Sequence, residues 1–484
     1  MASLVKIVST IVLLFSAALV VSIPARAVQT DIVEQVKDTL AGAGASNPER
    51  LTNINGTLYF EADDGVHGRE LWISDGTPGG TKMVKDIRSG SSGGGVFQPT
   101  NVNGTLFFQA IDDTHGRELW KSDGTETGTV LVKDIFPGSS SASPNNMSVI
   151  NGTLFFQATE GVHGRELWRS DGTNTGTTLV KDIRTGMDGS FPQPAFEFNG
   201  EAYFEARDDI HGAELWKSDG TEAGTVLLKD VNPGPNGSSP RNFSRIDEFF
   251  LFAARNDNTG RELWKSDSAE AGTVQVKDIE PGMDDSDLAD FVVIGNKVVF
   301  NANTSANGRE PWVSDGTNGG TQLIRDIDLG DLSSLPIASQ FEFGVSGSTA
   351  FFLADEMVRG AELYKTNGEP TGTVLVKDIV PGDMDSSPMH ITDVNGAVYF
   401  QALDIVLGTE LWKTDGTEAG TVLVDDIYPG GNGSLPEELV NVNGILYFSA
   451  NDGATGRELY RAYVRTDTPP VFDDVPESHP FYNN

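Results

Sequence analysis

The sequence contains no cysteine among its 484 residues. This absence excludes disulfide scaffolds, thiol nucleophiles, iron–sulfur clusters and cysteine-ligated zinc. Histidine is scarce as well, with six residues, so little material remains for metal or acid–base chemistry. Basic residues are also few, because 34 Lys and Arg stand against 70 Asp and Glu, for a net charge of -36 at pH 7. Such a field repels polyanions, so we expect no nucleic-acid partner.

Enzyme signatures are missing too. The sequence has no G-x-S-x-G elbow, no H-E-x-x-H helix, no phosphate loop and no dinucleotide fingerprint. Carboxylate pairs for glycoside hydrolysis follow no local spacing rule, and acidic residues are plentiful, so that chemistry stays open. We lean toward a protein without catalytic activity and assign no catalytic residues.

The N-terminus has the pattern of a secretory signal peptide over residues 1–27. A short start with Lys6 precedes an apolar run from Ile7 to Ile23, and Ala25-Arg26-Ala27 supplies an A-x-A cleavage site. The alternative is an uncleaved membrane anchor. No later stretch is long and apolar enough to cross a membrane. We therefore expect a protein that is secreted or displayed at the cell surface.

A 48-residue repeat organises the rest of the chain. Six of the seven tryptophans recur at this interval. The glutamate that stands two residues before them recurs nine times, also in copies without the tryptophan, so it marks nine copies. The nine glutamates are Glu70, Glu118, Glu166, Glu214, Glu262, Glu310, Glu362, Glu410 and Glu458. The gap after Glu310 is longer, and its extra residues fall within 327–346.

Each copy contains four short β-prone segments separated by turn signals. In the second copy these segments are residues 99–102, 105–110, 118–122 and 130–135. An Asn-Gly turn joins the first two segments and an Asp-Gly-Thr turn joins the last two, which is typical of antiparallel hairpins. The 55 glycines of the chain serve largely such turns. Four-stranded units of this length are the blades of a β-propeller.

The two ends of the array complement each other. Val36–Leu40 reads as a lone fourth strand, whereas Leu439–Val464 supplies three strands and lacks the fourth. We predict an all-β fold over residues 28–464, a single propeller of nine blades in which the N-terminal strand closes the last blade. Eight blades with a displaced terminal unit is the alternative.

The repeated string ELWxSDGTxxGTxLVKDI resembles the bacterial ELWxxDGT repeat family. The resemblance covers residues 28–464 and implies an exported, propeller-like repeat protein, without an activity or catalytic residues to transfer. Departures occur at Asp267-Ser268-Ala269, at Pro311 and at Tyr364, which makes the fifth to seventh blades the least regular.

The repeated residues favour structural roles. The tryptophans are interpreted as core between blades rather than as platforms for sugars. The recurring Glu, and the Asp of the VKD segments, are interpreted as partners of buried backbone groups or of Lys and Arg rather than as acid–base pairs. The histidines at His67, His115, His163 and His211 are interpreted as turn residues rather than as an anion or metal site.

One irregular acidic loop offers a metal-site hypothesis. Asp284, Asp285, Asp287 and Asp290 supply hard oxygen ligands on a short segment, so they are our candidates for calcium binding. Because the D-x-D-x-D-G pattern is absent, a solvated acidic loop is the favoured alternative. No other cofactor is expected.

Residues 465–484 form a linker and tail. The stretch from Val471 to Tyr482 resembles the opening of an S-layer homology module, which implies a truncated cell-wall-binding module; a disordered tail is the other interpretation. Taken together, the sequence predicts a monomeric propeller that serves as a binding or structural module for an extracellular glycan or protein. The alternative is a secreted carbohydrate-active hydrolase or lyase with an acidic site at the propeller mouth.

Overall fold

A computed structural model describes residues 31–329, 333–335 and 343–464. Within this part of the chain, thirty-six strands form nine four-stranded antiparallel sheets, and the one helix is a 3-10 turn, η1 (Pro370–Gly372). The nine-blade propeller predicted from the repeat is confirmed, and the eight-blade alternative is wrong. The predicted signal peptide and tail, residues 1–27 and 465–484, lie outside the described residues.

We number the blades from the first complete one. Blades 1 to 3 consist of β2 (Glu49–Ile54), β3 (Thr57–Asp63), β4 (Arg69–Ser74), β5 (Lys82–Lys85), β6 (Phe97–Val102), β7 (Thr105–Asp112), β8 (Gly116–Ser122), β9 (Val130–Lys133), β10 (Asn145–Ile150), β11 (Thr153–Ala158), β12 (Glu166–Ser170) and β13 (Thr178–Lys181). Blades 4 to 6 consist of β14 (Phe196–Phe198), β15 (Glu201–Asp208), β16 (Gly212–Ser218), β17 (Val226–Lys229), β18 (Arg241–Ile246), β19 (Phe249–Asn256), β20 (Gly260–Ser266), β21 (Val274–Lys277), β22 (Ala289–Ile294), β23 (Lys297–Thr304), β24 (Gly308–Ser314) and β25 (Gln322–Leu323). Blades 7 to 9 consist of β26 (Gly344–Ser346), β27 (Thr349–Glu356), β28 (Gly360–Thr366), β29 (Val374–Lys377), β30 (Met389–Val394), β31 (Ala397–Asp404), β32 (Gly408–Thr414), β33 (Val422–Asp425), β34 (Glu437–Val442), β35 (Ile445–Asn451) and β36 (Arg457–Val464), completed by β1 (Asp31–Lys37).

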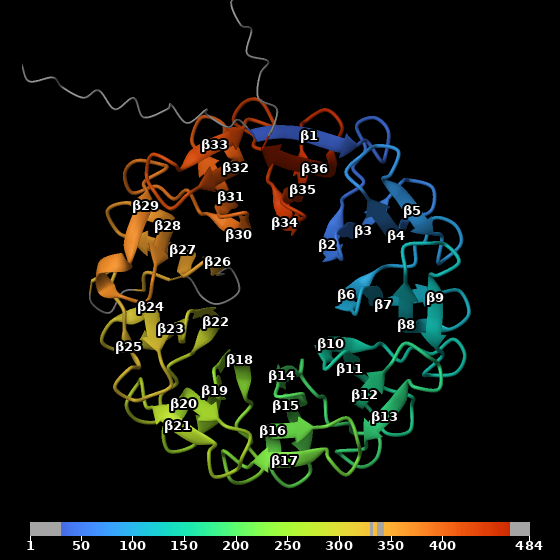
Figure 1. Ribbon diagram of the computed structural model, residues 1–484, viewed down its shortest axis with the longest axis vertical. Helices are drawn as coiled ribbons and strands as arrows, with labels where there is room; N and C mark the ends of the chain where they lie inside the picture. Colours follow the sequence, from blue (N-terminus) through green and yellow to red (C-terminus); the bar gives the residue numbers. More distant parts are fainter. Residues whose placement is uncertain (1–30, 330–332, 336–342, 465–484) are drawn as a thin grey trace, which may run out of the picture. The chain divides into compact units, whose positions relative to one another are not determined.

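The blades form a ring in which the first strand of each blade is innermost and the fourth lies at the rim (Figure 1). Ring closure depends on β1, which pairs with β36 as the fourth strand of blade 9. Lys37 on β1 donates a hydrogen bond of 2.7 Å to the carbonyl of Thr81 in blade 1. Lys133 makes the same 2.7 Å bond to Thr177 between blades 2 and 3. The closing junction therefore repeats the internal ones.

Core packing explains why both faces of each strand are apolar. Trp120 and Phe108 belong to a buried cluster shared with blade 1, whereas Leu119 and Phe107 belong to the cluster shared with blade 3. Alternate residues of a strand point to opposite faces, so each blade is covered on both sides by its neighbours. The tryptophans are 5% to 8% exposed, which confirms their assignment to the core.

The turns form as their residues require. Asn55 and Gly56 have φ values of 50° and 86°, the left-handed pair that an Asn-Gly hairpin needs. In the Asp-Gly-Thr turn, the Asp123 carboxylate accepts hydrogen bonds from the backbone N–H and the hydroxyl of Thr125 at 2.9 and 2.7 Å. Blade 5 keeps this turn although Ser268 replaces the glycine, at a φ of 80°.

No helix among the described residues is long and apolar enough to span a membrane.

Candidate functional site

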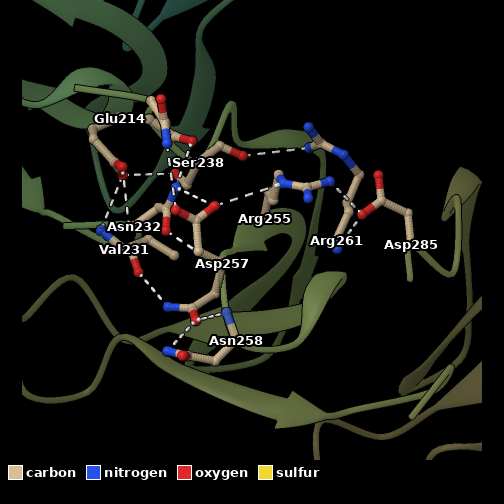
Figure 2. Close-up of polar contacts among 12 residues, drawn as sticks. Glu214, Val231, Asn232, Ser238, Arg255, Asp257, Asn258, Arg261 and Asp285 are labelled. Carbon is tan, nitrogen blue, oxygen red and sulfur yellow. Dashed lines mark hydrogen bonds and ion pairs between the residues drawn. The ribbon is translucent and has the colours of Figure 1, made fainter. Parts of the chain in front are cut away.

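The recurring glutamate binds the backbone of the loop that leads to the next blade. In blade 4, Glu214 accepts hydrogen bonds from the N–H groups of Val231 and Asn232 at 3.0 and 3.1 Å, and from the Ser238 hydroxyl at 2.6 Å (Figure 2). All nine equivalent glutamates are 0% exposed. The predicted structural role of these residues is confirmed.

The recurring aspartate lies close to this glutamate and behaves differently. One carboxylate oxygen of each is buried without a hydrogen-bond partner in seven blades, at Asp86, Asp134, Asp182, Asp230, Asp326, Asp378 and Asp426. The prediction that these aspartates satisfy buried donors therefore does not hold for this oxygen. Burial raises the pKa of Glu214 to about 7, and the charge of Asp230 adds to the rise, whereas the bonds from Ser238 and the backbone lower it.

The four loop histidines each contact a carboxylate of their own loop. Nδ1 of His67 and of His115 lies 2.7 Å from Asp64 and Asp112, respectively. These side-chain contacts raise the pKa of both histidines. Because the same aspartates also accept backbone N–H groups of the loop, the arrangement is a local turn rather than a shared site, as predicted.

The calcium candidates have separate partners. Asp285 accepts a 2.7 Å hydrogen bond from the side chain of Arg255 and a 2.9 Å bond from the backbone N–H of Arg261 (Figure 2). Asp287 lies 3.6 Å from the Arg309 guanidinium. Asp290 accepts a hydrogen bond from the side chain of Asn301. Asp284 is exposed, and its carbonyl oxygen lies against Gly260.

Among the described residues, no three His, Asp or Glu side chains lie together as a metal site would require. Calcium binding by the four aspartates stays a prediction, which calorimetric titration with calcium would test.

Arginines bind the backbone at the start of the first strand in several blades. Arg261 donates a 2.6 Å hydrogen bond to the carbonyl of Ser239, and Arg309 donates a 2.8 Å bond to the carbonyl of Asp287. Ser239 and Asp287 both have left-handed backbones, with φ of 45° and 46°. Asp287 thus occupies a repeated backbone position rather than a special loop.

The residue two positions after this one varies among the blades, with glutamate in blades 1 and 9 and a different type in each of the others. It is Glu49, Phe97, Asn145, Gln193, Arg241, Ala289, Met389 or Glu437 in the eight blades where the structure describes it. Repeated backbone geometry thus presents non-repeated side chains here, which is the arrangement a specific binding site needs.

The largest departure surrounds Arg241. A hollow of about 460 Å³ lies between blades 4 and 5, the blade 4–5 hollow, lined among others by Gln193, Phe196, Glu205, Arg241, Asn242 and Phe243. The rings of Phe196 and Phe243 stack with centroids 5.8 Å apart and planes inclined by 17°. Both rings are partly exposed, so they offer an apolar wall to solvent.

Two opposite charges in this hollow have no partner. Within the described residues, neither the Arg241 guanidinium nor the Glu205 carboxylate forms a hydrogen bond or an ion pair. Burial raises the pKa of Glu205, and the charges of Arg261, Arg207 and Arg241 oppose that rise.

A second hollow adjoins the first. The blade 5–6 hollow, of about 370 Å³, shares Arg241 and Asn242 with it and adds Asp287, Asp290 and Arg309. Burial raises the pKa of Asp290 to about 6, although the Asn301 contact and the Arg309 charge lower it. Two of the four calcium candidates therefore line a hollow, beside an arginine.

The sequence reasoning missed Phe196, Glu205, Arg241 and Phe243. The available signal was the repeat itself, since Phe196 and Arg241 stand where the other described blades carry different types. Aligning the copies column by column would have singled out these two residues, but not Glu205 or Phe243, which match Glu61 of blade 1 and Phe291 of blade 6.

Comparison with known proteins finds only distant structural similarity. No protein-family model matches it, and no curated protein matches it. Among solved structures, the computationally designed protein Ika8 is 13% identical with a TM-score of 0.42, over 77% of this chain and 96% of its own. Puromycin hydrolase is 14% identical with a TM-score of 0.36, over 76% of this chain, which spans 60% of that protein. A structure from an analysis of two prolyl endopeptidases is 12% identical with a TM-score of 0.40, over 80% of this chain, which spans 55% of that protein. Likenesses this distant carry no information about what this chain binds or does.

Proposed function

We propose that this protein is an exported interaction module, secreted or held at the cell surface, that binds an extracellular glycan or protein through the blade 4–5 and blade 5–6 hollows. The resemblance to the ELWxxDGT repeat family and the signal-like residues 1–27 support export. If the tail resembling an S-layer homology module attaches to the cell wall, it supplies the surface location.

One observation carries the binding role. The repeated tryptophans are buried in the core, and the repeated glutamates and histidines bind groups of the propeller itself. Among the described residues, Arg241 and Glu205 form no hydrogen bond or ion pair through their side chains. Charged groups that form no ion pair beside an apolar wall are the groups that fix a ligand in a pocket.

A second function has its own support. Glu205 and Asp290 are carboxyl groups with a raised pKa, in hollows that meet at Arg241. A raised pKa favours the protonated form of a carboxyl group, which the general acid of a glycoside hydrolase requires. The alternative is therefore a carbohydrate-active hydrolase that uses these two residues.

One experiment separates the two functions. The protein produced from its full coding sequence is applied to a glycan array and to purified cell walls, and bound polysaccharides are assayed for new reducing ends. The interaction module predicts retention of the wild type without cleavage. The double variant Glu205→Gln, Asp290→Asn should be retained more weakly, because it alters a group proposed to contact the ligand. Cleavage by the wild type that this variant loses would establish the hydrolase. Absence of retention on any glycan, cell wall or extracellular protein would refute the binding role.

A further inference from the structure

We propose that the blade 4–5 hollow binds a carboxylated sugar residue, a uronic acid, within an otherwise uncharged extracellular glycan. The inference rests on the proposed binding function and specifies its ligand.

The carboxylate is assigned to Arg241. This side chain is exposed, has no partner among the described residues, and lies near a second guanidinium, that of Arg261. Burial lowers the pKa of Arg261 and the charge of Arg241 lowers it further, whereas the charges of Asp285 and Glu205 raise it. Arg241 itself forms no direct ion pair among the described residues, and a guanidinium binds a carboxylate through two parallel hydrogen bonds.

The sugar ring is assigned to the phenylalanine wall. Phe196 and Phe243 stack and are partly exposed, and Phe250 supports both rings at centroid distances of 5.6 and 6.0 Å. This wall is therefore rigid. A flat face of C–H groups, which a pyranose ring presents, packs on such a surface, whereas a carboxylate alone needs no such wall.

The ring hydroxyls are assigned to the remaining polar groups. Glu205 has no partner, and the Asn242 amide donates to the Leu288 carbonyl at 2.9 Å, which leaves its own oxygen as an acceptor. Gln193 is exposed at the edge of the hollow. Carboxylate and amide oxygens accept hydrogen bonds from hydroxyls, and amide groups donate to them.

The overall charge limits how many carboxylates the ligand carries. With a net charge of -36, the protein repels a polyanion at long range. Repulsion of that kind acts weakly on a glycan with a single carboxylate at physiological ionic strength. We therefore assign an isolated uronic acid rather than a polyuronate.

Calorimetric titration tests the assignment with two trisaccharides, one carrying a single glucuronic acid and one with glucose in its place. We expect the acidic trisaccharide to bind at least tenfold more tightly, since a hydrogen-bonded charge contributes enough for a factor of ten. Arg241→Gln should remove this preference, and Phe243→Leu should weaken both sugars. The matched control is Arg245→Gln on the same strand, because the Arg245 guanidinium lies over the Phe198 ring at 4.8 Å. Unfolding curves of all variants verify that they are folded.

Equal binding of the two trisaccharides, or a preference that survives in Arg241→Gln, would overturn the proposal. So would tight binding of an acidic tripeptide with no binding of either sugar, because the ligand would then be a protein segment. If neither trisaccharide binds while the protein is still retained on cell walls, the uronic acid assignment fails and the interaction module stands. If retention is lost as well, both fail.

Discussion

Blades 1 and 5 have the same strand pairing but differ in their charged residues, which form ion pairs with one another at the first strand of blade 1 and do not at the first strand of blade 5. In blade 1, Arg69 lies 3.0 Å from Glu49 and 3.3 Å from Glu61, and Arg50 also pairs with Glu61. At the three positions equivalent to Glu49, Glu61 and Arg69, blade 5 carries Arg241, Ala253 and Arg261.

The difference teaches what a repeat protein can vary. Strand pairing is the same, with Glu49 opposite Glu61 in blade 1 and Arg241 opposite Ala253 in blade 5. The hydrogen bonds between the strands are the same in both blades. Blade 5 therefore keeps its fold although it lacks the two acidic residues that correspond to Glu49 and Glu61. What remains in blade 5 is Arg241, which lines a hollow and forms no direct ion pair among the described residues.

The largest expected effect tests the framework that both blades share. Folding raises the pKa of the buried repeat glutamates, for example to about 7 in Glu70 and to about 8 in Glu262, mainly through burial. A raised pKa in the folded state contributes stability that is complete below the unfolded value of about 4.5 and is lost as pH rises through the folded value. The midpoint of urea-induced unfolding should therefore be clearly higher at pH 5 than at pH 8.5.

Other groups do not reverse this expectation. The pKa of turn carboxylates such as Asp75 and Asp123 is lowered, chiefly by hydrogen bonds from Thr77 and Thr125, so these groups titrate below the range compared. The loop histidines, whose pKa is raised, act in the same direction as the glutamates. A midpoint that is equal or higher at pH 8.5 would show that the repeat glutamates are ionised in the folded protein.

The next effect concerns the core. Trp72 in blade 1 and Trp264 in blade 5 are 5% and 7% exposed. Replacing either with alanine should lower the free energy of unfolding by about 3–5 kcal/mol, because a large buried side chain leaves a cavity. Equal losses in chemical denaturation would show that the two blades share one framework. A much smaller loss for Trp264→Ala would mean that blade 5 is loosely packed throughout, and not only at its mouth.

A smaller effect separates the paired and unpaired carboxylates. Glu61 is 2% exposed and holds two arginines, so Glu61→Ala should cost about 2 kcal/mol by leaving them without a counter-charge. Glu205 has no such partner, and Glu205→Ala should change stability by no more than about 0.5 kcal/mol. Thermal and urea unfolding of both variants measures the difference. A large loss for Glu205→Ala would give this residue a structural role and weaken its assignment to a ligand.

The sequence predicted the features that depend on local or periodic signals. Nine blades, the presence of an N-terminal closing strand and the buried tryptophans follow from the 48-residue period and from turns such as Asn55-Gly56, because these need no knowledge of distant partners. The predicted bounds of the closing strand, Val36–Leu40, are wrong, since β1 spans Asp31–Lys37. The blade 4–5 hollow was not predicted, since it arises where Glu205 of one blade faces Arg241 of the next. The acidic loop was singled out by composition alone, and the partner of Asp285 in the structure, Arg255, lies on β19, far from this loop in the sequence.

The variant Arg241→Glu should change stability least and binding most clearly. Arg241→Glu places in blade 5 the residue that blade 1 carries at the same position, where Glu49 pairs with Arg69 at 3.0 Å. The new carboxylate should pair with Arg261 and stabilise the fold by no more than about 1 kcal/mol, as an exposed ion pair does. The same change removes the proposed carboxylate-binding group, so binding of the glucuronic acid trisaccharide should fall at least tenfold while the unfolding curve stays nearly unchanged. The reverse change, Glu49→Arg, should create like-charge crowding in blade 1 without a sugar site, because the neighbouring residues that correspond to the phenylalanine wall are absent there. If the Glu49→Arg variant bound the acidic trisaccharide at blade 1, charge alone, and not the hollow, would select the ligand.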